Sequence, residues 1–164
     1  MKYPQELQNF WADAEKWSKV HAPEDWPVSA ETAELFENHL SRLQPVADSG
    51  DDYACYAMAS IYLLELIYPD EATRDERFDR DRVTMTALLY RCSENGMVAA
   101  FDNLVTSGVG EIGDSARAAA KDYERDRKPD WDDSSGMPVY TPTWMESAMN
   151  LWKTRRGEQD RMKR

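Results

Sequence analysis

Apolar residues recur along this chain with the period of an α-helix rather than that of a β-strand. Between Gln5 and Val20 they fall at three- and four-residue intervals, at Leu7, Phe10, Trp11, Ala14, Trp17 and Val20. The spacing predicts an amphipathic helix over residues 5–20. We assign its aromatic stripe to the core, because the intervening polar positions are largely acidic, whereas a membrane-binding helix carries a basic polar face.

The same spacing predicts six more helices, over residues 29–45, 52–67, 83–95, 98–107, 114–127 and 142–156. Ser29 is placed to cap the second of them, Pro45 is expected to end it, and Gly157 is expected to end the last. Residues 52–67 are apolar nearly all round, so this helix is expected to be the most buried. The pattern therefore predicts an all-α fold of about seven helices.

Three segments lack this pattern. Residues 69–82 carry a dense run of both charges, which we interpret as a solvated loop or a short exposed helix. The glycines at 108, 110 and 113 predict a flexible turn, which lacks the Gly-Lys-Ser/Thr ending of a phosphate-binding loop. Residues 128–141 form the longest segment for which no regular structure is expected.

A glycine followed by an alanine-rich helix occurs twice, starting at Gly50 and at Gly96. Aligning the two glycines, which are 46 residues apart, pairs Ala54 with Ala100 and places a helix before each glycine. This unit of helix, glycine turn and helix predicts stacked antiparallel helical hairpins, a short α-solenoid in which the first and last helices act as caps. An independent helical bundle is the alternative.

Residues 47–123 resemble Sel-one-like repeats, a subclass of the tetratricopeptide-like repeats. The run Ala87-Leu88-Leu89-Tyr90-Arg91-Cys92-Ser93-Glu94-Asn95-Gly96 is similar to the second helix of that repeat, and residues 50–62 are similar to its run of glycine, alanine, aromatic and leucine residues. The Gly108-Val109 turn and the helix after it also fit. The chain departs from the pattern in the charged insert at 69–82 and at Asp102, where an aromatic residue is usual. The resemblance implies an adaptor or an immunity protein that neutralises a toxin.

Length and charge narrow the class of protein. The 164 residues suit one domain over residues 1–156 followed by a charged tail at 157–164. The formal net charge of −11 repels nucleic acids and anionic membranes and attracts a basic partner. The chain begins without an apolar leader and has no stretch long enough to span a membrane, so a cytoplasmic protein is expected. Its oligomeric state is left open.

The residues that usually carry chemistry do not form a recognisable set. Cys55 and Cys92 lie within helical patterns and are interpreted as small buried apolar groups without a disulfide. His21 and His39 have no partner at the spacing of metal ligands, and His39 is interpreted as a partly exposed helix residue. Carboxylates are plentiful, but their polar surroundings do not favour the raised pKa that acid catalysis needs. We therefore expect a non-enzymatic protein without cofactor or metal.

These observations predict a protein-binding module that presents an acidic surface to a basic protein partner. Aromatic side chains supply anchors and carboxylates steer the encounter, so the predicted contact residues are Asp51, Asp52, Asp130, Trp131, Asp132, Asp133 and Tyr140. An alternative for Trp131 is that it folds back on the body. The alternatives for the whole chain are an enzyme with a carboxylate-lined cleft between helices and a structural subunit that self-associates.

Overall fold

The computed structural model describes residues 2–21, 24–126, 130–131, 138–139 and 142–163. The described residues form seven α-helices and one short antiparallel hairpin: α1 (Gln5–Ser18), α2 (Ala30–Asp48), α3 (Asp52–Leu63), α4 (Glu71–Glu94), α5 (Val98–Ser107), α6 (Gly110–Asp126), β1 (Asp130–Trp131), β2 (Pro138–Val139) and α7 (Pro142–Met162). The prediction of an all-α fold with about seven helices is confirmed.

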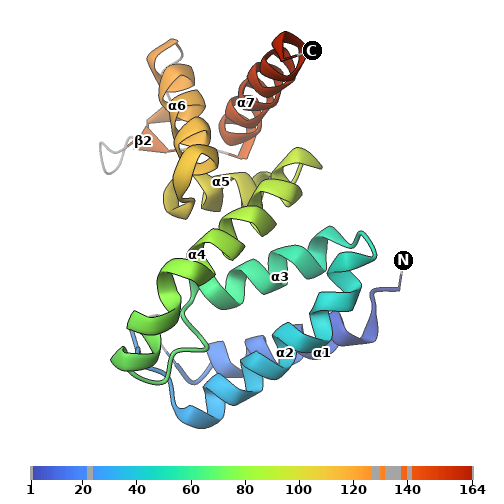
Figure 1. Cartoon of the computed structure of the whole chain (residues 1–164), viewed down its shortest axis with the longest axis vertical. Helices are drawn as coiled ribbons and strands as arrows, with labels where there is room; N and C mark the ends of the chain where they lie inside the picture. Colours follow the sequence, from blue (N-terminus) through green and yellow to red (C-terminus); the bar gives the residue numbers. More distant parts are fainter. Residues whose placement is uncertain (1, 22–23, 127–129, 132–137, 140–141, 164) are drawn as a thin grey trace.

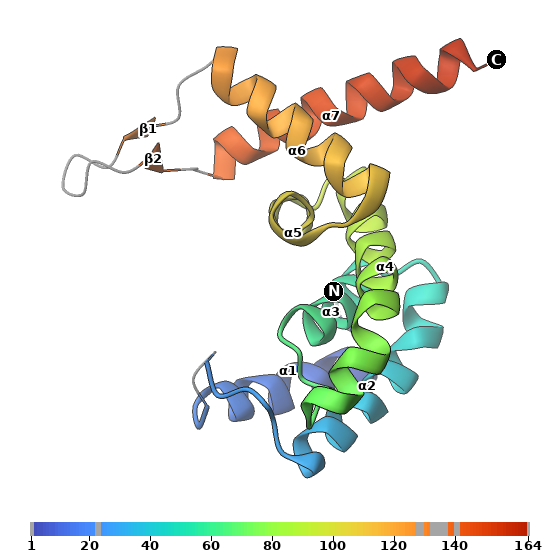
Figure 2. The same cartoon turned by 60° about the vertical axis from the view of Figure 1, so that its left-hand side comes forward.

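The helices stack in chain order. Each one packs against the next, and α1 also contacts α3, α4 contacts α6 and α5 contacts α7. Figure 1 shows the stack running from α1 and α2 at one end to α6 and α7 at the other. Figure 2 shows that α1, α3 and α5 lie on one side of the curved stack, with α2 and α4 on the other. We call the first side the α1/α3/α5 face. These contacts are those of a short α-solenoid.

The two glycines that define the repeat end their helices in the same way. Gly50 and Gly96 have φ values of +107° and +94°, a conformation that glycine adopts without steric cost. Each helix closes with the two backbone hydrogen bonds of a Schellman motif. In the first, Gly50 N–H donates to Ala47 O (3.0 Å) and Asp51 N–H donates to Val46 O (3.4 Å). In the second, Gly96 N–H donates to Ser93 O (3.0 Å) and Met97 N–H donates to Cys92 O (3.0 Å). The repeated sequence thus encodes a repeated turn.

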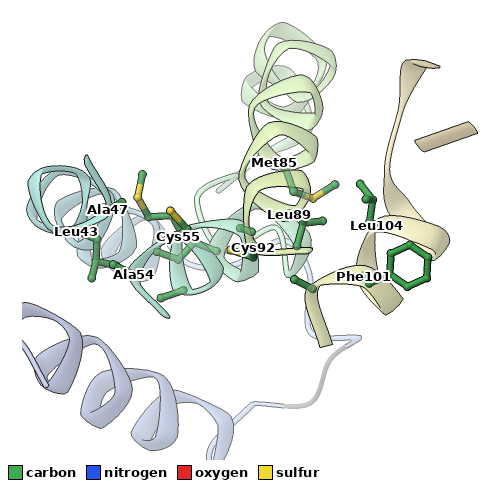
Figure 3. Packing of buried hydrophobic residues seen from close by; sticks show 14 of the residues in the cluster. Leu43, Ala47, Ala54, Cys55, Met85, Leu89, Cys92, Phe101 and Leu104 are labelled. Carbon is green, nitrogen blue, oxygen red and sulfur yellow. The ribbon is translucent and has the colours of Figure 1, made fainter. Parts of the chain in front are cut away.

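The buried positions of the two units also coincide when they are shifted by 46 residues. The coinciding buried pairs include Leu43 with Leu89, Ala47 with Ser93, Ala54 with Ala100, Cys55 with Phe101 and Met58 with Leu104. Figure 3 shows Leu43 and Ala47 of α2 beside Ala54 and Cys55 of α3, and Met85 and Leu89 of α4 beside Leu104 and Phe101 of α5. Both cysteines are buried and free, as expected. The small alanines let the paired helices approach closely.

Of the two interpretations of the charged segment at 69–82, a helix is the one found, but it is not short, because residues 71–82 form the N-terminal half of the 24-residue α4. Asp70 caps this helix by accepting a hydrogen bond from Thr73 N–H at 2.7 Å. Asp81, which is only 6% exposed, accepts a hydrogen bond from the Tyr68 hydroxyl at 2.8 Å. The Arg77 guanidinium donates a hydrogen bond to the Glu37 carboxylate of α2. The charges therefore fasten α4 to its neighbours instead of serving only as a solvated surface.

Several helix boundaries also differ from those expected. Pro45 does not end α2, which continues to Asp48. Proline has no N–H to donate to the carbonyl four residues earlier, which here belongs to Ser41. Because Pro45 and Ser41 are both exposed, water can donate a hydrogen bond to that carbonyl instead. The third helix ends at Leu63 rather than at residue 67, and α7 runs past Gly157 to Met162, so most of the expected tail is helical.

The turn with three glycines is tighter than expected, because α6 starts inside it at Gly110. Gly108 and Gly113 lie in close contact: a Cβ atom built on Gly113 would stand 2.4 Å from the Gly108 carbonyl oxygen. The glycines here allow close packing of two backbone segments. The Val109 N–H donates to Thr86 Oγ1 of α4 at 3.0 Å, which fixes the turn against the stack.

Candidate binding surface

A cluster of three aromatic side chains, which we call the aromatic group, lies on the α1/α3/α5 face. The rings of Tyr3 and Trp11 are 4.9 Å apart, and those of Tyr3 and Tyr53 are 5.6 Å apart, both edge to face. Trp11 of α1 remains 39% exposed and Tyr53 of α3 50% exposed. These side chains come from three segments of the chain, and they hold one another in place while leaving aromatic surface open to solvent.

A groove of about 500 Å³ adjoins this aromatic group. It crosses the N-terminal ends of α3 and α5, and α1 supplies one wall through Trp11. The lining residues are Trp11, Asp52, Tyr53, Tyr56, Asn95, Gly96, Met97 and Ala99. The first repeated unit contributes residues after its glycine, and the second contributes its glycine turn, so the groove is built where consecutive units meet.

Asp52 is the one carboxylate among these lining residues, and one of its two oxygens is already bound. Its Oδ1 accepts a hydrogen bond from Asn95 Nδ2 at 3.0 Å and lies 3.8 Å from Arg91 Nε. Asp52 Oδ2 makes no hydrogen bond to the described part of the chain. The Asn103 side-chain amide donates to the Tyr56 hydroxyl at 3.0 Å. The groove thus combines fixed aromatic walls with one carboxylate oxygen that remains free for a ligand.

The predicted contact residues fall into two groups that the structure does not bring together. Asp51 and Asp52 lie at the turn between α2 and α3, whereas Asp130 and Trp131 form β1, paired with Val139 and Pro138 of β2. Figures 1 and 2 show the hairpin beyond α6, well away from the α2–α3 turn. The remaining predicted contact residues, Asp132, Asp133 and Tyr140, lie outside the described residues.

Asp51 has a structural role that the sequence interpretation did not assign to it. Its Oδ1 accepts a hydrogen bond from Ala54 N–H at 2.9 Å, so it is the N-cap of α3. Asp52, one residue further, lines the groove. The two neighbouring carboxylates therefore divide into one that starts a helix and one that faces a possible ligand.

Two aromatic residues of the candidate surface were expected in the core. Trp11 was counted in the buried stripe of α1, and Tyr53 in the helix expected to be the most buried. The buried residues of α1 are Leu7 and Phe10. Trp11 directly follows Phe10, and neighbours on a helix point about 100° apart, so Trp11 lies to one side of the stripe that Leu7 and Phe10 bury.

His39 was expected to be partly exposed, but it is only 2% exposed. Its Nε2 lies 2.8 Å from Asp13 Oδ2, and its ring packs against those of Phe10 and Phe36. The pairing joins α1 to α2. Within the described residues, no group of three or more histidine, cysteine, aspartate or glutamate side chains is arranged to hold a metal ion.

Comparisons with known proteins identify no relative: no family model matches the sequence, and neither a curated protein nor a solved structure does. None of the helices in the described ranges combines the length and the apolar character needed to cross a membrane. Function must therefore be argued from the surface itself.

Proposed function

We propose that this chain is a non-enzymatic protein-binding module that holds a basic protein partner on its α1/α3/α5 face. The observation that carries the proposal is the pair of exposed aromatic side chains, Trp11 and Tyr53, beside a groove that contains the Asp52 carboxylate. Tryptophan and tyrosine are the residues on which binding energy most often concentrates. The net charge of −11 adds long-range attraction for a basic partner.

The roles that suit such a surface are those of an adaptor or of a cytoplasmic immunity protein that neutralises a basic toxin. The resemblance to Sel-one-like repeats supports both. A strongly acidic inhibitor associates rapidly with a basic target, because complementary charge raises the association rate. The hairpin that carries Asp130 and Trp131 is a second contact region in this proposal, on a different part of the molecule.

Two alternative functions for this face are catalysis and self-association. Carboxylate catalysis uses two acidic groups, but Asp52 alone provides one here, which favours binding over chemistry. Self-association through the exposed aromatic residues would leave the protein dimeric without a partner. The oligomeric state in solution, measured by light scattering, separates that alternative from binding to a different protein.

Site-specific photo-crosslinking tests the proposal. A photoreactive phenylalanine analogue replaces Tyr53 in one variant and Leu35 in another; Leu35 lies on α2 and is 38% exposed, almost the same as Trp11. We expect a basic protein to crosslink from position 53 at low salt and not from position 35. Crosslinking from position 35 alone, or a partner without excess positive charge, refutes the assignment.

The purified partner then allows a quantitative comparison. Replacing Trp11 and Tyr53 by alanine is expected to weaken binding by about 2 kcal/mol or more, roughly thirtyfold, because hot-spot residues contribute at this level. Leu35→Ala is the matched control and should leave the affinity unchanged. Asp52→Asn is expected to reduce the salt dependence of the association rate, whereas Asp75→Asn, at an exposed site on α4, should have a smaller effect.

A further inference from the structure

A second cavity, of about 350 Å³, lies at the other ends of α3 and α5 and is independent of the binding groove. The N-terminal half of α4 forms its wall. The residues that matter for its chemistry are Tyr62, Phe78, Arg82, Met85 and Ser107. Its volume is within the range of small-molecule sites, and the lining combines apolar side chains with a few polar groups, as such sites do.

The cavity contains a cation, Arg82, that forms no ion pair within the part of the chain that the structure describes. Arg74, which also lines it, is paired with Glu65 at 2.6 Å. Arg82 makes no ion pair with any residue in the described ranges; its guanidinium lies over the Phe78 ring, 5.3 Å from the ring centroid. Because Phe78 borders this cavity, the stacking places the guanidinium at the cavity wall.

Asp81, the buried carboxylate that precedes Arg82 in the chain, is engaged elsewhere. Asp81 accepts the Tyr68 hydroxyl hydrogen bond and lies 3.7 Å from Nε of both Arg77 and Arg80. It is thus committed to groups other than Arg82. The positive charge of Arg82 remains available to a ligand.

Tyr62 supplies a hydrogen-bond donor to the same cavity. Its hydroxyl has no hydrogen-bond partner among the described residues, unlike that of Tyr68. Burial, followed by the nearby Asp81 and Glu37 charges, raises the pKa of Tyr62, so the phenol keeps its proton at neutral pH. The Ser107 hydroxyl makes only a long 3.5 Å contact with Thr106 Oγ1. Leu63, Phe78 and Met85 provide the apolar part of the lining.

We propose that this cavity binds a small monocarboxylate with an apolar body, such as an aromatic acid. Arg82 pairs with the carboxylate, Tyr62 donates a hydrogen bond to it, and the body of the ligand lies against Phe78 and Met85. Arginine matches the planar geometry of a carboxylate, and charge-assisted hydrogen bonds are the strong ones.

A phosphate fits the cavity less well. Helices α3 and α5 end at Leu63 and Ser107, and both residues line the cavity. The C-terminal end of a helix carries partial negative charge, which opposes a doubly charged anion more than a singly charged one. A single unpaired arginine also provides less compensation than a phosphate normally receives.

Nuclear magnetic resonance with ¹³C-methyl methionine tests the proposal, because Met85 lines the cavity and reports occupancy directly. The probes are benzoate, its uncharged analogue benzamide and inorganic phosphate. We expect benzoate to shift the Met85 methyl signal saturably, and benzamide to bind at least about tenfold more weakly, since a charged hydrogen bond contributes about 1.5–3 kcal/mol. Equal binding of benzamide, or tighter binding of phosphate, overturns the proposal.

Two variants and a matched control test whether Arg82 and Tyr62 bind the carboxylate of benzoate. Arg82→Gln is expected to weaken benzoate binding about tenfold or more, whereas Arg42→Gln, at an exposed site on α2, should leave it unchanged. Tyr62→Phe should weaken binding to a lesser extent and provides a second test if Arg82→Gln impairs folding, which circular dichroism detects. Benzoate binding that survives both Arg82→Gln and Tyr62→Phe, or the absence of a saturable Met85 shift, refutes the assignment.

Discussion

Removing the Asp81 carboxylate should destabilise the fold strongly, because it leaves a buried hydroxyl without an acceptor. Asp81 is 6% exposed, and the Tyr68 side chain that donates to it is fully buried. In the variant Asp81→Ala, the Tyr68 hydroxyl loses the acceptor that it bonds among the described residues. The perturbation therefore acts on the junction between α4 and the segment that precedes it.

The magnitude follows from the individual contacts. An unsatisfied buried donor costs about 1–3 kcal/mol, and the lost bond was to a charged group, which places the cost near the upper end. Arg77 keeps its bond to Glu37, and Arg80 is 69% exposed, so each adds at most about 1 kcal/mol. We expect Asp81→Ala to lower the free energy of unfolding by about 3 kcal/mol.

Urea unfolding followed by circular dichroism measures this effect, and an unchanged m-value shows that the comparison is valid. Tyr68→Phe should cost about 1–1.5 kcal/mol, and the double variant should be less destabilised than the sum of the two, because the contact is lost only once. Asp79→Ala, at an exposed position on the same helix, is the control and should change stability by less than about 0.5 kcal/mol. Additive effects, or a loss below about 0.5 kcal/mol for Asp81→Ala, would show that the hydrogen bond does not matter.

Three further predictions concern other contacts. Burial, and then the hydrogen bond to the Asp81 carboxylate, raises the pKa of Tyr68 above the ordinary value of 10.0. The contribution of Tyr68 to stability is therefore complete below pH 10.0 and declines as the pH rises above that value. Urea titrations at increasing pH should show a steeper loss of stability for the native chain than for Tyr68→Phe. Gly113→Ala should destabilise the fold by about 2 kcal/mol in thermal unfolding, since the methyl group would overlap backbone atoms and this outweighs the gain of about 1 kcal/mol in helix propensity. A neutral or stabilising result would show that the turn relaxes easily. Arg156→Ala should cost about 1–2 kcal/mol, because Arg156 donates to the Tyr90 hydroxyl at 2.8 Å and stacks on its ring; an unchanged melting temperature would contradict this.

Much of the fold was predictable because its signals are local. The φ angles at Gly50 and Gly96 and the capping of α2 by Ser29, which accepts from Thr32 N–H at 3.1 Å, depend on residues within one turn. The sequence left the 69–82 segment open between a loop and a short helix, because the order of this segment depends on distant partners. Glu37, for example, lies 40 residues before Arg77, and the local sequence around either residue does not predict their hydrogen bond.

The candidate surface was predictable only in part. Asp52 was identified from its place in an acidic turn, but its contact with Asn95 joins residues 43 positions apart in the chain and required the fold. The exposure of Tyr53 depends on how α1 packs against α3. Helical periodicity identifies an apolar stripe, but it does not say how wide a strip the neighbouring helices cover.

The neighbour-to-neighbour packing of the stack has a mechanical consequence. The principal contacts join each helix to the next one or two along the chain, and none joins α1 or α2 to α6 or α7. Small rotations at successive interfaces therefore add up along the molecule without being resisted by a closing contact. The separation between Trp11 at one end and the hairpin at the other is consequently elastic, and a bound protein that touches both ends would set the curvature of the stack.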